Sequence, residues 1–149
     1  MKPFLNLNQH KQIPFFRIIY LESDANYTYV HTTTAKKALS SYTIGVLYKQ
    51  LDKHMFYRAN RKLVFNLHFV EEIWYDGEYV FLNLVTGKEV ALSRRQSSLF
   101  KIFLKKNFGF KIPHRYETAN VKILHLTEVR STFKLNTQTQ YCESPVGCL

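Results

Sequence analysis

The sequence has few of the residues that build covalent, metal or phosphate-loop sites. Only 2 of its 149 residues are cysteines, and both, Cys142 and Cys148, lie near the C-terminus. They offer neither a disulfide framework nor a four-ligand metal site. The 5 glycines form no G-x-G-x-x-G or G-x-x-x-x-G-K motif, and the 6 histidines show no metal-ligand spacing. We therefore expect neither a metal nor another cofactor.

Long apolar runs and acidic residues are also scarce. No apolar run approaches the roughly 18 residues of a membrane helix, and the start of the chain lacks the apolar core of a signal peptide. We therefore expect a cytoplasmic protein with no membrane partner. The 11 acidic residues are outnumbered by 21 basic ones, which gives a formal charge of +10. Such an excess favours polyanionic partners, of which nucleic acid is one and an anionic surface another.

The residues that are abundant predict a folded, mainly β domain. Apolar residues make up 46% of the chain and aromatic residues 15%, too many for a disordered segment. β-branched and aromatic runs alternate with turn signals, of which Asp76-Gly77 is the strongest, and helical spacing of apolar residues occurs twice. The predicted elements are an opening hairpin (4–8 and 13–16), strands at 17–21, 27–34, 38–41, 56–58, 70–75, 79–85 and 88–92, and helices at 44–53 and 96–107, the second closed by Gly109. No helical crossover joins two strands, so the sheets should be antiparallel.

Residues that could perform catalysis do not form a recognisable group. Glu71 and Glu72 are neighbours on a strand and point to opposite faces, and the carboxylates of the hairpin tip at Asp76 and Glu78 are too solvated to have shifted pKa values. No serine stands in a G-x-S-x-G elbow. The sequence does not indicate an enzyme.

Three polar or basic clusters stand at the ends of predicted elements instead. They cover residues 23–28, 58–62 and 93–96. Asn and Arg side chains pair with the edges of adenine and guanine, whereas Lys, Ser and Thr suit phosphates. Each cluster taken alone is more often a solvated surface than a binding site. Together, loops of this kind on a rigid β scaffold are suited to insertion into DNA grooves.

The order and spacing of these clusters resemble a known family. The segments IYLESDANYTYVH (19–31), FYRANRKLVFNL (56–67) and GKEVALSRR (87–95) are similar to motifs of the LytTR DNA-binding domain of bacterial transcription regulators. The resemblance covers residues 1–107. It implies elongated, mainly β architecture of short antiparallel sheets with one or two short helices. It also implies loops that contact successive major grooves at promoter sites arranged as direct repeats, where two copies would form a homodimer on duplex DNA.

The resemblance also implies the residues that contact DNA. By position they are Asn26, Tyr27, Thr28, Asn60, Arg61, Lys62, Arg94 and Arg95. Many relatives carry His followed by Arg-Ser in place of Asn60-Arg61-Lys62, so the base preference is expected to differ, although Asn60 still suits adenine. Asn66 also matches the motif, but side-chain hydrogen bonds that fix the following turn are its more ordinary role.

Two features of the chain depart from the resemblance. The matching region starts at residue 1 without a preceding receiver domain, so we expect either a stand-alone regulator or a fragment of a longer one. Residues 108–149 have no counterpart and are expected to form a partly mobile tail, with a strand at 121–126 and a polar stretch from Asn136 onward.

The hypothesis that competes with sequence-specific DNA binding is a basic β module that binds protein or an anionic surface without base specificity.

Overall fold

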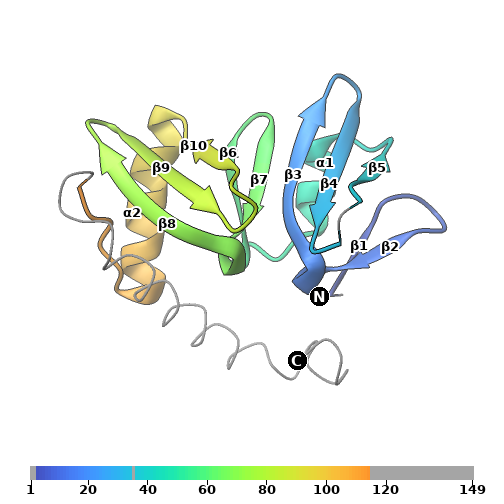
Figure 1. The fold of residues 1–149 in the computed structure, drawn as a ribbon, viewed down its shortest axis with the longest axis horizontal. Coiled ribbons are helices and arrows are strands. Elements are labelled where there is room, and N and C mark those ends of the chain that lie inside the picture. The colour runs from blue at the N-terminus through green and yellow to red at the C-terminus, as the bar shows by residue number, and fades with distance from the viewer. Residues whose placement is uncertain (1–2, 35, 115–149) are drawn as a thin grey trace. The chain divides into compact units, whose positions relative to one another are not determined.

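The computed structural model describes residues 3–34 and 36–114, which form two compact units. The N-terminal unit runs to His68, and the C-terminal unit begins at Phe69. Within the described residues, each unit combines antiparallel strands with one α-helix (Figure 1). The predicted mainly β class with short helices is confirmed.

A five-stranded antiparallel sheet forms the body of the N-terminal unit, in the order β5-β4-β3-β7-β6. Its strands are β3 (Ile18–Asp24), β4 (Tyr27–Thr32), β5 (Ala38–Ser40), β6 (Phe56–Asn60) and β7 (Leu63–Asn66). A separate hairpin of β1 (Phe4–Asn6) and β2 (Gln12–Pro14) precedes the sheet, as predicted. The sequence predicted strands at 17–21 and 27–34, but β3 continues to Asp24. Only a two-residue turn therefore separates β3 from β4.

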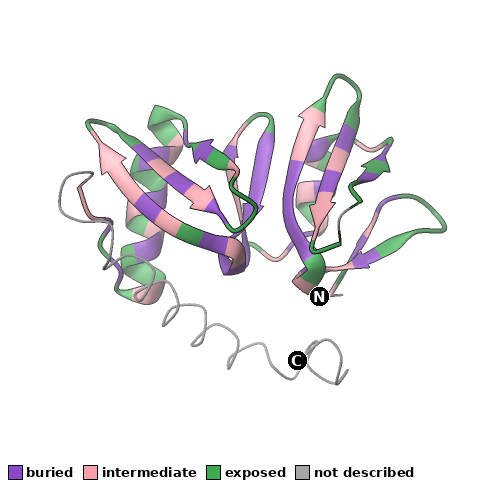
Figure 2. Ribbon diagram, in the orientation of Figure 1, coloured by how far each residue is buried: buried purple, intermediate pink, exposed green. Residues whose placement is uncertain are grey.

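Helix α1 (Ile44–Gln50) contributes to the core of this unit and is shorter than predicted. It begins after Thr43, whose hydroxyl accepts a hydrogen bond from the Val46 N–H. It ends three residues before the predicted residue 53 because Leu51 turns into extended backbone and is fully buried. In Figure 2, buried residues line the central strands β3 and β7 along most of their length.

The buried residue Asn66 joins three segments of the N-terminal unit. Its Nδ2 donates to the carbonyl of Ile18 at 2.8 Å, and its Oδ1 accepts from the N–H of His68 at 2.9 Å. Buried polar groups are stable only when they are bonded in this way. The predicted turn-fixing role of Asn66 is confirmed.

The C-terminal unit has a three-stranded antiparallel sheet in the order β10-β9-β8. Its elements are β8 (Val70–Asp76), β9 (Tyr79–Leu84), β10 (Glu89–Ala91) and α2 (Arg94–Phe108). The predicted hairpin at Asp76-Gly77 is present, and Gly77 adopts a left-handed φ of 62°. Helix α2 begins two residues earlier than predicted because Ser93 caps it, and Gly109 closes it with a φ of 64°, as predicted.

The residues that follow α2 pack against the C-terminal unit. Phe110 and Ile112 are buried, and the carbonyl of Pro113 accepts a hydrogen bond from the N–H of Tyr75 on β8 at 3.0 Å. The unit therefore extends past residue 107, where the sequence placed its boundary. The predicted strand at 121–126 and the stretch from Asn136 onward lie outside the described residues.

Candidate nucleic-acid interface

The β3–β4 turn presents two of the predicted residues to solvent. Asp24 pairs with Tyr27, so only Ala25 and Asn26 form the loop between the strands. Ala25 has a positive φ of 52°, which a residue with a Cβ adopts at some conformational cost. Asn26 is exposed, and Tyr27 is 51% exposed.

Thr28, the third predicted residue of this turn, is fully buried. Its hydroxyl donates to the carbonyl of Tyr42 at 2.9 Å, which ties β4 to the segment that precedes α1. Because strand residues alternate between faces, Tyr27 points outward and Thr28 inward. The structure thus gives Thr28 a supporting position, not a surface one.

The β6–β7 turn is held by hydrogen bonds from its own side chains. The Oδ1 of Asn60 accepts from the N–H of Lys62 at 2.8 Å. The guanidinium of Arg58 donates to the carbonyls of Asn60 and Arg61 at 3.2 Å and 3.1 Å. Asn60 is half-buried, whereas Arg61 and Lys62 are exposed. Asn60 therefore shapes the turn that presents the two basic side chains.

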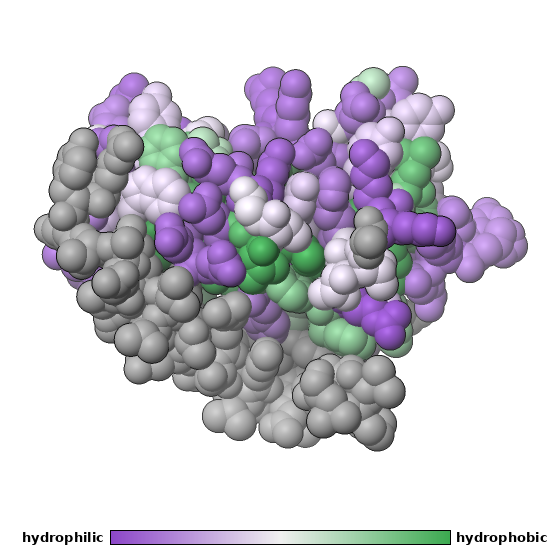
Figure 3. Space-filling model, viewed as in Figure 1, coloured by the Kyte–Doolittle hydropathy of each residue, from purple (hydrophilic) through white to green (hydrophobic). Residues whose placement is uncertain are grey.

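These two turns lie at the same end of the five-stranded sheet. β3 pairs with β7 so that Glu22 lies opposite Leu63, and the N–H of Ser23 donates to the carbonyl of Lys62 at 2.8 Å. Both turns are at the top of the view in Figure 1. In the space-filling view, the β6–β7 turn is a hydrophilic projection (Figure 3). The tertiary structure thus brings together two clusters that lie thirty or more positions apart in the sequence.

Arg58 is the functional residue that the sequence analysis did not single out within its cluster. Its guanidinium carbon lies 6.0 Å from the ring centroid of Tyr48 on α1, and the ammonium of Lys53 lies 3.7 Å from the same centroid. No local pattern in the sequence marks it, because its role depends on the irregular pairing of β6 with β7 between Arg58 and Asn60.

Burial shifts the pKa values of the side chains behind this turn. Loss of hydration raises the pKa of Tyr57 to about 12, and the nearby Tyr48 adds to the effect. Burial also raises the pKa of Tyr48, against the opposing influence of Arg58. Loss of hydration also lowers the pKa of Lys53, although the negative charge of Asp52 acts in the opposite direction. Two of these groups, Tyr48 and Lys53, lie beside Arg58, the residue that bonds the turn, or beside its aromatic partner.

Arg94 and Arg95 occupy the first turn of α2 in the C-terminal unit, and both are exposed. Arg94 Nε lies 3.2 Å from a carboxylate oxygen of Glu78, in the β8–β9 turn, but both side chains are about two-thirds exposed or more. Exposed pairs of this kind are weak, so an anion of higher charge can displace the carboxylate. The first turn of α2 has no acidic residue, and its N–H groups also favour anions.

Comparison with known proteins connects these turns to a family. The family model described as the LytTr DNA-binding domain matches residues 8–105. The chain belongs to the LytTR family. All eight predicted contact residues lie inside the matched range, and LytTR domains bind DNA.

A solved LytTR structure has the same fold. It is described as the LytTr DNA-binding domain of a methyl-accepting/DNA response regulator from Bacillus cereus. The two chains are 25% identical and superpose with a TM-score of 0.57 over 72% of this chain and 95% of that one. Among curated proteins no match is found.

Residues 3–34 and 36–114 contain no group of three or more His, Cys, Asp or Glu side chains that could hold a metal ion. The helices that these residues form include none long and apolar enough to cross a membrane.

Proposed function

We propose that this LytTR chain binds double-stranded DNA in a sequence-specific manner and regulates transcription. The observation that carries the proposal is the side-by-side placement of the β3–β4 and β6–β7 turns, which present Asn26, Tyr27, Arg61 and Lys62 from one end of a sheet. Short turns on a rigid sheet are suited to the major groove, which admits narrow protein elements and displays a distinct pattern for each base pair.

The proposal assigns different roles to the exposed residues. Arg61 and Arg94 read base edges, because a guanidinium pairs bidentately with guanine O6 and N7. Lys62 and Arg95 hold phosphates, and the α2 N-terminus adds backbone donors to the Arg95 contact. Asn60 contributes mainly by shaping its turn, in which its Oδ1 accepts from the N–H of Lys62.

The proposal also includes contacts with successive major grooves, at target sites that are arranged as direct repeats. Each unit makes its own contact, through its turns or through the start of α2. A repeat of the target sequence would place two copies on one duplex as a homodimer. The protein would act in the cytoplasm, where bacterial DNA is located.

The test is selection of duplexes from a random DNA library, followed by competition. A specific binder retains the selected fragment against an excess of random duplex, whereas a module that binds through charge alone releases it. Affinity should also fall steeply with salt, by about 0.9 log units per log unit of salt for each phosphate contact. Six contacts correspond to roughly a thousandfold loss between 50 and 200 mM salt. A flat salt response, or equal retention of both duplexes, would contradict the proposal.

A further inference from the structure

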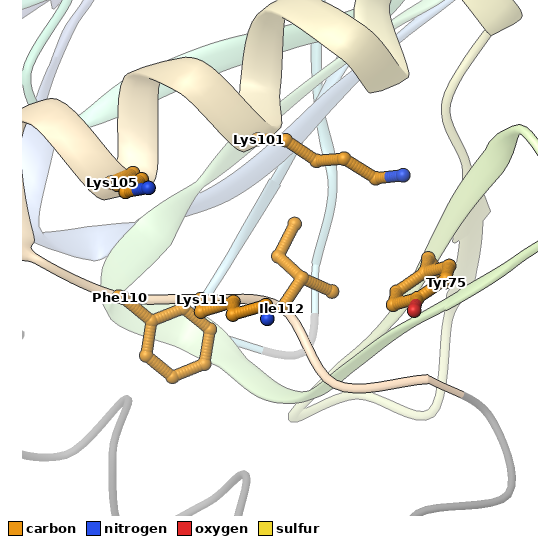
Figure 4. A pocket seen from close by; sticks show the side chains of 6 residues that line it. All are labelled: Tyr75, Lys101, Lys105, Phe110, Lys111 and Ile112. Atoms are coloured by element: carbon orange, nitrogen blue, oxygen red, sulfur yellow. The ribbon is translucent and has the colours of Figure 1, made fainter.

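The C-terminal unit contains a pocket of about 360 Å³ that none of the proposed DNA contacts enters. Its lining residues come from β8, α2 and the segment after α2: Tyr75, Lys101, Lys105, Phe110, Lys111 and Ile112 (Figure 4). Its size lies in the range typical of small-ligand pockets, about 300–1,000 Å³.

The C-terminal end of α2 creates this pocket. Gly109, in the left-handed conformation, donates to the carbonyl of Lys105 at 3.0 Å, and the chain then reverses direction. The reversed segment is tied to β8 by the hydrogen bond between Tyr75 and Pro113. Phe110 and Ile112 are buried, whereas Lys111 between them is exposed, as alternation in an extended segment requires. Two buried apolar side chains and an exposed lysine of this segment thus line the pocket.

Three of the residues that line the pocket are lysines. Lys101 and Lys105 are four residues apart on α2, so they lie on one face of the helix, and Lys111 faces them from the returning segment. None of the described lining residues is acidic. Like charges at this helical spacing repel each other in the absence of an anion.

One of the three lysines is held in place at the edge of the pocket. The ammonium of Lys101 lies 4.4 Å from the ring centroid of Tyr75, a cation–π contact. Figure 4 shows the Lys101 side chain extending from α2 toward that ring. This contact keeps the ammonium beside the pocket, so less ordering is needed when a ligand binds.

We propose that this pocket binds a phosphate group. Ammonium groups act as compact point charges with three donors each, and they are common ligands of phosphate oxygens. The phosphate could belong to a free small molecule or to a DNA backbone. The proposal goes beyond the base-reading function, because its residues are separate from the eight predicted contacts.

The experiment uses two probes on the full chain: pyrophosphate, by calorimetry at constant ionic strength, and the selected duplex, by fluorescence anisotropy. Lys105→Gln is compared with Lys106→Gln, because the two lysines are adjacent and exposed on α2 but only Lys105 lines the pocket. We expect Lys105→Gln to weaken binding about 3- to 10-fold and Lys106→Gln to change it less than twofold. The triple variant Lys101→Gln/Lys105→Gln/Lys111→Gln should remove saturable binding.

Each outcome of the two arms has a defined meaning. Loss confined to pyrophosphate assigns the pocket to a free phosphate compound. Loss in the DNA arm, beyond that of Lys106→Gln, assigns it to a backbone phosphate. The proposal is wrong if neither probe distinguishes Lys105→Gln from Lys106→Gln. Circular dichroism verifies folding, and the single variants decide if the triple variant unfolds. Pyrophosphate binding is measured without DNA. Its result therefore does not depend on the proposed DNA-binding function, and a failure of either proposal can be recognised on its own.

Discussion

The two units of this chain present basic side chains in different ways. In the N-terminal unit, Arg61 and Lys62 project from a turn that Asn60 and Arg58 hold by hydrogen bonds, above a sheet braced by buried polar groups. In the C-terminal unit, Arg94 and Arg95 project from a helix end, and that helix is held mainly by apolar packing. In the first arrangement, hydrogen bonds fix the backbone of the turn from which the basic side chains project. The second places two exposed side chains at the positively polarised start of a helix.

The C-terminal unit should lose stability if the apolar residues that pack after α2 are removed. A chain ending at Asn107 loses the cap at Gly109 and the buried Phe110 and Ile112, which should cost about 3–6 kcal/mol relative to a chain ending at His114. Urea unfolding monitored by the fluorescence of Trp74, the one tryptophan of the sequence, reports on this unit. Equal unfolding midpoints for the two chains would show that the segment adds nothing, as the sequence-based boundary implied.

In both units, the arginines proposed to read bases should differ from the lysine proposed to hold a phosphate. Arg61→Ala and Arg94→Ala should each cost about 1–3 kcal/mol on the selected duplex and relax preference at one or two base pairs. Lys62→Ala is the control: it should weaken all duplexes about equally and lower the salt slope by about one unit. Thermal stability should stay within about 0.5 kcal/mol for all three. If both arginine variants stay folded and bind the selected and random duplexes with unaltered relative affinity, these arginines do not read bases.

The brace beneath the β3–β4 turn should be sensitive to loss of one hydroxyl. Thr28→Val keeps the shape of the side chain but leaves the carbonyl of Tyr42 without its buried donor, at a cost on the order of 1–2 kcal/mol in unfolding free energy. Thr28→Ser retains the hydroxyl and should lose less than Thr28→Val. If the Ser and Val variants are equally stable but bind DNA differently, Thr28 would have a contact role after all.

The ion pair at the start of α2 should matter little for folding. Glu78→Gln removes the exposed partner of Arg94 and should change stability by less than about 0.5 kcal/mol. DNA affinity should rise a few-fold, because a competing anion beside Arg94 has gone. Glu89→Gln, an exposed carboxylate on β10, makes the same change in net charge elsewhere in the unit. Equal gains from both variants would attribute the effect to net charge alone.

The support of the β6–β7 turn should be sensitive to high pH. Since burial raises the pKa of Tyr57 to about 12, the folded state favours the neutral phenol. That preference stabilises the fold below the ordinary pKa of 10 and is lost as the pH rises from about 10 to 12. Tyr57→Phe should therefore lose less stability than the wild type over this interval, as measured by melting temperatures. Parallel losses in both proteins would show that Tyr57 titrates normally.

Local patterns predicted most of the secondary structure. Alternation and β-branched runs placed the strands, and Asp76-Gly77 and Gly109 marked a hairpin and a helix end, because each depends on backbone preferences of neighbouring residues. One strand was missed, because no strand was predicted at β7 (Leu63–Asn66). The other errors were at boundaries: β3 runs through a polar stretch to Asp24, and α1 stops at Gln50. Pairing with β4 and burial of Leu51 decided those ends, and neither is visible in a local window.

By itself the sequence determined the fold class, the LytTR resemblance and the basic residues with the potential to meet DNA. Those properties depend on composition and on motifs a few residues long. Only the tertiary structure decided which of those side chains are presented: Thr28 is turned inward, Asn60 is engaged in its own turn, and Arg61 and Lys62 lie beside the β3–β4 turn. It also gathered Lys101, Lys105 and Lys111 around one pocket. Strand pairing and chain reversal bring distant residues together, and their partners are set by packing across the whole unit rather than by the local sequence.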